Sequence, residues 1–190
     1  MRHQRPSTMA LLALCLMVVV PVNAQNFATG PDLDVPFFPT PMPVVTEMLR
    51  VANVSAEDMV YDLGSGDGRI VIAAARDFGA RGVGIDIDPQ RVREATYNAE
   101  KAGVADRVRF LDGDIFKADI REATVVTLYL LPSVNFQLRP KLLRDLRAGT
   151  RVVSHNYDMA DWKPEKTITV TVSGSQHTVY YWVVPSRDGQ

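Results

Sequence analysis

The sequence predicts an α/β fold, a doubly wound and mostly parallel sheet of seven strands that ends in an antiparallel hairpin. Three observations support this prediction. A glycine-rich turn at residues 61–69 joins an apolar run to a helix-like run, strand and helix patterns alternate after it, and two β-rich runs close the chain. Strands that alternate with helices indicate a parallel sheet covered on both faces.

The predicted elements follow one another with short connections. Residues 25–41 form an extended arm, and Thr40 is expected to cap a helix whose first position is Pro41. Strands are expected at 59–63, 81–86, 107–112, 123–130 and 150–155, and helices at 69–78, 89–103 and 132–147. The hairpin is expected at 166–172 and 178–184, around the turn 173–176. The short connection before the hairpin suggests that one helix of the alternation is missing or reduced.

Composition limits the chain to one ordinary globular core. Of its 190 residues 46% are hydrophobic and 23% are charged, and the net charge is -1. Because proteins that bind phosphate backbones usually carry a basic excess, this balance gives no support for a nucleic-acid partner. The domain itself is expected to cover residues 42–190.

Residues 1–24 have the pattern of a signal peptide, with a basic start, an apolar run from Ala10 to Val20, and small residues before a cleavage point after Ala24. An uncleaved membrane anchor and a mitochondrial-type presequence are the alternatives. The single cysteine, Cys15, lies in this segment, so the mature chain would have no thiol. We therefore expect an exported protein, periplasmic or secreted, without a stable membrane span after cleavage.

The glycine turn reads Asp62-Leu-Gly-Ser-Gly-Asp-Gly, followed by Arg69 and Ile70. Glycines allow positive φ and close approach of a ligand, and the following helix directs unpaired N–H groups towards that ligand. The turn lacks the Lys and Ser or Thr of a phosphate loop, and its spacing is not that of the dinucleotide fingerprint. Its two carboxylates would repel a pyrophosphate and suit a ligand with a cationic centre.

This motif resembles the first motif of class I methyltransferases, which have a Rossmann-like fold and bind S-adenosylmethionine (SAM). Within that class, residues 35–184 resemble small non-SET protein-lysine methyltransferases that modify adenine nucleotide translocase or the ATP synthase c-subunit. The resemblance implies methyl transfer from SAM to a protein lysine. A SAM- or nucleoside-binding module without turnover, a small-molecule methyltransferase, and an NAD-type oxidoreductase remain as alternatives.

The resemblance also assigns a set of cofactor-binding residues. Asp86 ends the second expected strand, 18 residues after Gly68, where a carboxylate can accept both ribose hydroxyls. Asp114 and Ile115 follow the third strand, where the adenine is read. The full set is Asp62, Gly64, Ser65, Gly66, Asp67, Gly68, Asp86, Ile87, Asp114 and Ile115. Asp88 before Pro89 is expected to cap a helix rather than to bind metal with Asp86, and no metal is predicted.

The acceptor side carries weaker signals. The fourth strand ends Leu-Tyr-Leu-Leu-Pro-Ser-Val-Asn at 128–135, without the Asn/Asp-Pro-Pro-Tyr/Phe pattern of enzymes that methylate bases or glutamine amides. Tyr129 and Asn135 are the predicted catalytic residues, with Asn156 and Tyr157 as further candidates. His155 is expected to have an interior role or to act as a general base. Phe37 and Phe38 either plug the core or belong to an arm that closes over the cofactor.

Overall fold

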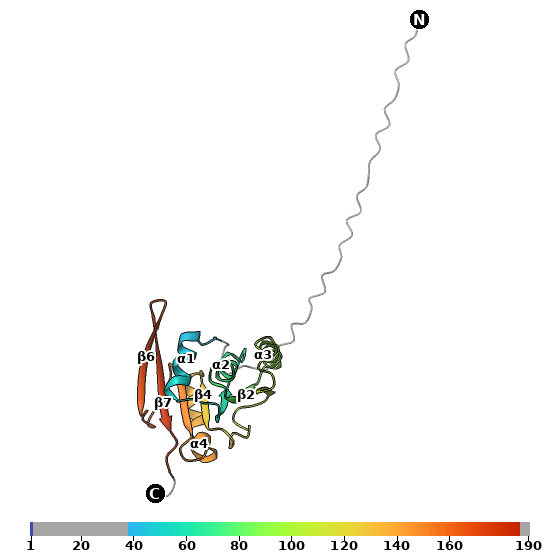
Figure 1. The fold of residues 1–190 in the computed structure, drawn as a ribbon. Coiled ribbons are helices and arrows are strands. Elements are labelled where there is room, and N and C mark those ends of the chain that lie inside the picture. The colour runs from blue at the N-terminus through green and yellow to red at the C-terminus, as the bar shows by residue number, and fades with distance from the viewer. Residues whose placement is uncertain (2–37, 187–190) are drawn as a thin grey trace.

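The computed structural model describes Met1 and residues 38–186, and within them the predicted α/β architecture is confirmed (Figure 1). One seven-stranded sheet has the order β3-β2-β1-β4-β5-β7-β6. The first five strands are parallel, and β7 pairs antiparallel with both β5 and β6. The expected signal peptide, and the arm up to residue 37, lie outside the described residues.

The elements lie close to their predicted positions. The strands are β1 (Met59–Leu63), β2 (Arg81–Asp86), β3 (Val108–Asp112), β4 (Val125–Leu128), β5 (Arg151–His155), β6 (Lys166–Val172) and β7 (Ser175–Val183). The helices are α1 (Met42–Val51), α2 (Arg69–Phe78), α3 (Pro89–Lys101) and α4 (Pro132–Asp145).

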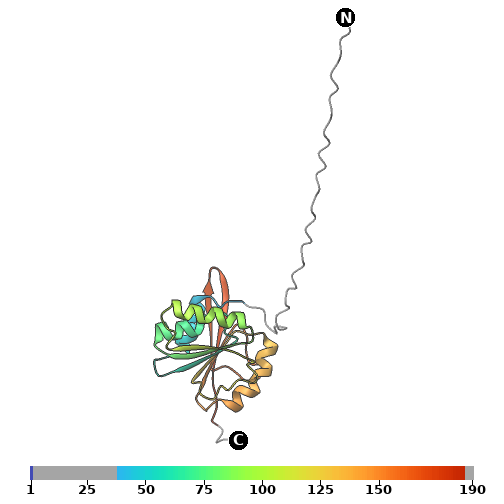
Figure 2. The ribbon, with the colours of Figure 1, turned by 90° about the vertical axis from the view of Figure 1, so that its right-hand side faces the viewer.

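Helices cover both faces of the sheet, as the doubly wound pattern requires (Figure 2). On one face α1 and α2 pack through residues such as Met48 and Ala74, and α2 and α3 pack through Val71 and Ala99. On the other face α4 contributes Leu138 and Leu142 to a cluster that contains the inward side chains of β1, β2 and β4. Each apolar helix stripe is therefore buried against the sheet, which leaves the carboxyl ends of the strands open for a site.

The first helix corrects a sequence prediction. Its N-cap is Pro41, no side chain caps it, and the hydroxyl of Thr40 lies instead 3.2 Å from Nδ1 of His155 on β5. Pro41 has an extended backbone (φ −59°, ψ 141°) and its carbonyl accepts the amides of Val44 and Val45. The prediction of a Thr40 cap was wrong because a long-range partner, invisible to local pattern, holds that side chain.

Strand and helix ends differ from prediction by a few residues. The largest difference is at β7, which begins at Ser175 rather than residue 178 because the hairpin turn is only two residues long. Ser173 (φ 49°) and Gly174 (φ 83°) both have positive φ, the geometry whose twist matches that of a two-stranded ribbon. The pairing of Val172 with Ser175 therefore closes the hairpin three residues earlier than expected.

No helix connects β5 to β6 in the described chain, which confirms the reduced connection expected there. Residues 156–165 instead form an irregular segment with one isolated bridge, Met159 to Trp162. Asn156 has a positive φ of 63°, its amide donates to Thr178 O and its side-chain oxygen accepts from Thr178 N. Among the described residues, no helix is long and apolar enough to cross a membrane.

Candidate active site

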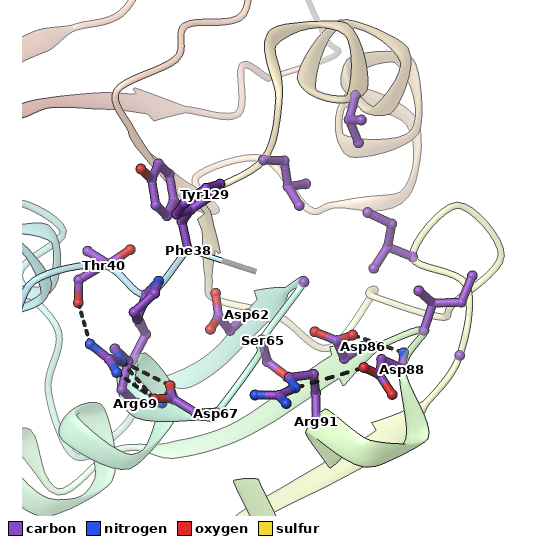
Figure 3. A pocket seen from close by; sticks show the side chains of 18 of the residues that line it. Phe38, Thr40, Asp62, Ser65, Asp67, Arg69, Asp86, Asp88, Arg91 and Tyr129 are labelled. Atoms are coloured by element: carbon purple, nitrogen blue, oxygen red, sulfur yellow. Dashed lines mark hydrogen bonds and ion pairs between the residues drawn. The ribbon is translucent and has the colours of Figure 1, made fainter. Parts of the chain in front are cut away.

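A pocket opens at the carboxyl ends of the parallel strands, where the chain order reverses between β1 and β4. Open α/β sheets bind ligands at such switch points. The pocket encloses about 1000 Å³, its open mouth included. Figure 3 shows Asp86 and Asp88 on one side of it and Phe38, Thr40 and Tyr129 on the other.

The predicted cofactor residues gather in this pocket. All of them except Gly66 and Gly68, which shape the turn, line its wall. Gly64, Gly66 and Gly68 have φ of 83°, 53° and 80°, so each needs the freedom of glycine. A Cβ on Gly68 would lie 2.6 Å from the ring of Phe110, which shows how closely the turn approaches the sheet.

The turn places Ser65 and the start of a helix at the wall of the pocket. Ser65 is buried, and its hydroxyl has no hydrogen-bond partner among the described residues. The helix α2 begins directly after the turn, with Gly68 as its N-cap and no side-chain cap. The positive end of this helix favours a negatively charged group, such as a carboxylate, beside the pocket wall.

Asp62 is the buried acid in this part of the pocket wall. The carboxylate is 2% exposed and accepts a 2.8 Å hydrogen bond from the Thr127 hydroxyl of β4. Burial raises the pKa of Asp62 to about 7, against the lowering effect of Thr127 and with help from the charges of Asp86 and Asp67. Without a cation nearby, Asp62 is therefore only part-ionised at neutral pH, and a cationic ligand would restore its charge.

Asp86, at the end of β2, is held by two backbone donors. One oxygen accepts from Gly66 N at 2.7 Å and the other from Asp88 N at 3.0 Å. Asp88 accepts from Gln90 N and caps α3, as predicted. The two carboxylates therefore serve different purposes, and in the described chain no group of three or more His, Cys, Asp or Glu could hold a metal ion.

The far end of the pocket has an apolar face and one further acid. Ile87 is 44% exposed and Ile115 is half-buried, and both line the pocket. Asp114 pairs with Lys117, which holds the pKa of the carboxyl below its usual range, and it also accepts from Phe116 N. These apolar side chains suit an adenine ring, and Asp114 in the same wall can accept a hydrogen bond from it.

The N-terminal arm forms the opposite wall. Phe38 is 67% exposed and lines the pocket, so it does not plug the core, and the alternative of an arm beside the cofactor site fits its position. Arg69 joins this arm to the glycine turn (Figure 3): its Nη1 donates to Thr40 O at 3.0 Å and its Nε to Asp67 at 2.9 Å.

Of the two predicted catalytic residues, Tyr129 lies at the acceptor side of the pocket and Asn135 does not. Tyr129 lines the pocket, stacks on His155 with ring centroids 3.9 Å apart, and has its pKa raised chiefly by burial. Asn135 is fully buried and is not part of the pocket wall. Its amide donates to Ser154 Oγ and Tyr157 O, so it holds the segment that follows β5.

Comparison with known proteins agrees with this geometry. Residues 62–166 match the ANTKMT methyltransferase domain. A protein-lysine N-methyltransferase of Saccharolobus islandicus is 50% identical over 151 residues, which is 79% of this chain and 94% of that protein. The chain belongs to this methyltransferase family.

Two further proteins are similar to this chain. The mouse lysine N-methyltransferase of the ATP synthase c-subunit is 34% identical over 132 residues, and the match spans 70% of this chain but only 53% of the mouse protein. A solved structure described as an RNA methyltransferase from Salinibacter ruber, in complex with S-adenosyl-L-homocysteine, is 60% identical with a TM-score of 0.74. It covers 79% of this chain and 95% of that one.

SAM is the cofactor of class I methyltransferases, and the pocket of this methyltransferase fits it. Asp86 can accept ribose hydroxyls, Ile87 and Ile115 suit an adenine, and the N-terminal end of α2 suits the carboxylate of the amino-acid tail. The buried acid Asp62 suits the cationic end.

Sequence reasoning missed several residues of this site. Arg69, Arg91 and Phe116 line the pocket, and His177 on β7 lies 2.9 Å from His155 through their ring nitrogens. Arg69 follows the glycine motif directly, so its position was a usable signal. No local pattern links His177 to His155, because the pair forms only when β7 aligns beside β5.

Proposed function

We propose that this methyltransferase transfers a methyl group from SAM to the side-chain amine of a protein lysine. The observation that supports it most strongly is the division of the pocket. Acids such as Asp86 occupy the end formed by β1, β2 and β3, and Phe38 and Tyr129 occupy the other end. A long aliphatic chain with a terminal amine suits an entrance with aromatic walls.

The residues of the chain would act mainly by positioning and by excluding water. Bound SAM supplies an electrophilic methyl group. Asp86 and the glycine turn orient the cofactor, and Asp62 favours its cationic form over the neutral product by electrostatic attraction. Phe38 and Tyr129 shield the opposite side, so the acceptor amine meets few waters and its neutral form, the nucleophile, is favoured.

The acceptor must be tested, because one relative is described as a protein-lysine enzyme and another as an RNA methyltransferase. The net charge of -1 and the acids around the pocket favour a lysine acceptor over an RNA phosphate backbone. RNA is the second candidate acceptor, because this chain is 60% identical to the structure described as an RNA methyltransferase.

The experiment has two stages. Calorimetric titration with SAM, S-adenosylhomocysteine and NAD tests the cofactor, and selective micromolar binding of the first two is expected. Labelled methyl transfer is then measured to lysine-containing peptides, to the same peptides with arginine or norleucine at the lysine, and to total RNA. Label that requires lysine supports the proposal, whereas label in RNA alone, or binding without transfer to any acceptor, overturns it.

We also propose that the chain is exported. This rests on the basic start, the apolar run and the small residues before Gln25, which lie outside the described part of the structure. N-terminal sequencing of the protein from periplasmic and cytoplasmic fractions tests it. A periplasmic chain that begins at Gln25 is the expected result, and a full-length chain confined to the cytoplasm would contradict export.

A further inference from the structure

A line of hydrogen-bonding side chains leads from the acceptor side of the pocket to the surface. It begins at Thr40, which lines the pocket. The Thr40 hydroxyl lies 3.2 Å from Nδ1 of His155. Nε2 of His155 lies 2.9 Å from Nδ1 of His177. Thr40 is 3% exposed and His155 is fully buried, whereas His177 is part-exposed on β7.

The reaction under "Proposed function" requires such an exit. A lysine amine has a pKa of about 10.4 and arrives protonated at neutral pH, so a proton must leave before the lone pair can attack. The acceptor approaches from the side of Phe38, Thr40 and Tyr129, because the opposite end holds the residues suited to the adenosine. An amine that is shielded from water by these walls needs a route for its proton.

The surroundings of the His155 ring suit the transfer of a proton rather than its storage. Burial, with the nearby His177, lowers the pKa of His155 to about 4, so this ring stays neutral. The titratable groups that face it are Tyr129 from the end of β4, stacked on its ring, and His177 from β7. A neutral imidazole with one accepting and one donating nitrogen can take a proton on one side while it releases one on the other.

We propose that Thr40, His155 and His177 form a proton relay that carries the acceptor proton from the pocket to solvent. The ammonium N–H bond breaks as its proton passes to Thr40 Oγ1, and the hydroxyl proton of Thr40 passes to His155 Nδ1. The Nε2 proton of His155 passes to Nδ1 of His177, whose own Nε2 proton leaves to water. One proton enters and one leaves, and no group keeps a net charge.

This relay makes the arm part of the catalytic apparatus. Thr40 would touch the acceptor amine, and the two histidines act through it. The inference rests on the proposed lysine acceptor. It also explains why the Thr40 side chain leaves the helix terminus uncapped, since its hydroxyl is used by β5 instead.

The decisive variant is His177→Gln, because His177 is part-exposed and its replacement leaves the core intact. Gln can hold one hydrogen bond to His155 but cannot pass a proton from one ring nitrogen to another. At pH 7 the kcat for peptide methylation should fall by about 100-fold, the lower end of the range for general acid–base steps. The loss should shrink as pH rises towards about 10, where the amine is already neutral. SAM affinity should not change.

Thr40 gives a matched pair that is independent of the histidines. Thr40→Ser keeps the hydroxyl and should keep most of the activity, whereas Thr40→Val keeps the shape and should show the loss and pH profile of His177→Gln. Imidazole added to His177→Ala should restore part of the rate. Wild-type kcat in His177→Gln, or a loss of equal size at every pH, overturns the relay while the lysine activity stands. Failure of the wild-type chain to methylate any lysine overturns both.

Discussion

The two sides of the pocket are built in opposite ways. The cofactor side comes from the ends of β1, β2 and β3, and its main part is the contiguous stretch 62–69. The acceptor side brings together residues far apart in the chain, such as Thr40 with His155, which are 115 positions apart. Cofactor binding can therefore be predicted from local sequence, whereas the acceptor site forms only when the whole sheet has folded.

The polar groups of the two sides are also satisfied differently. On the cofactor side carboxylates accept backbone amides, as Asp86 does from Gly66 and Asp88. On the acceptor side rings stack and side chains pair with one another, as in Tyr129 on His155 and His155 with His177. A substitution on the first side should therefore change ligand affinity, and one on the second should change turnover.

The largest effect on affinity is expected from Asp86→Asn. The amide keeps the shape but lacks the charge that strengthens bonds to ribose hydroxyls, and its NH2 group cannot accept one of the two backbone amides that Asp86 binds. Together these losses are worth about 2 to 3 kcal/mol, or roughly 30- to 150-fold in the Kd for SAM. Asp88→Asn is the matched control, because Asn caps α3 as well as Asp and should change the Kd less than about threefold. Calorimetry measures both, and equal losses in the two variants would refute the separate purposes given to these acids.

A second prediction concerns the amino ends of the strands, which belong to neither side of the pocket. Asp58 is 5% exposed and forms an ion pair with Arg151, whose Nη1 also donates to Ala52 O at the end of α1. Arg151→Ala leaves this carboxylate buried without its cation, so the free energy of unfolding should fall by about 3 kcal/mol. Denaturant unfolding measures it, with the exposed Arg147→Ala as control, and the SAM Kd of the folded variant should be unchanged.

The same pair sets an acid dependence. Burial acts to raise the pKa of Asp58, but hydrogen bonds from Thr124, Ser55 and Arg151 outweigh it and lower the pKa below 3.8. A lowered folded-state pKa contributes stability above the unfolded value, and that stability is lost as pH falls through the folded value. Arg151→Ala should therefore lose less stability than the wild type on acidification below about pH 4; an identical acid profile would show that Arg151 does not set this pKa.

The third prediction uses the pH dependence of Asp62. Its pKa is raised to about 7, so a ligand that carries positive charge binds the ionised form and lowers that pKa. SAM affinity should rise up to about tenfold per pH unit below about 7 and level off above it. The apoprotein should show the opposite trend, since a raised carboxyl pKa stabilises the fold most at low pH and this contribution is lost as pH rises through about 7.

Titration of the wild type from about pH 5.5 to 8.5, beside Asp62→Asn, tests this. The variant has no charge to gain, so its weaker SAM affinity should be flat across the range. A pH dependence that survives in Asp62→Asn would place the titrating group elsewhere.

These differences explain what sequence alone could predict. The seven strands, the glycine turn and the Asp88 cap were predicted correctly because each depends on neighbours within a few residues. The Thr40 cap was wrong because the arm meets β5, and His177 was missed because β7 aligns beside β5. The placement of Asn135 inside the molecule was also out of reach, since its partners lie on β5 and just beyond it.

The smallest effect should come from Arg69, which lies on the boundary between the two sides. Arg69→Ala removes the bond to Thr40 O that holds the arm, so the KM for the acceptor peptide should rise about fivefold, as expected for one hydrogen bond. The SAM Kd should change less than about twofold, and Arg69→Lys should be intermediate because lysine lacks the fork that binds Asp67 and Thr40 together. If the SAM Kd instead rises as much as the KM, the arm belongs to the cofactor side, and the two sides are one cooperative unit.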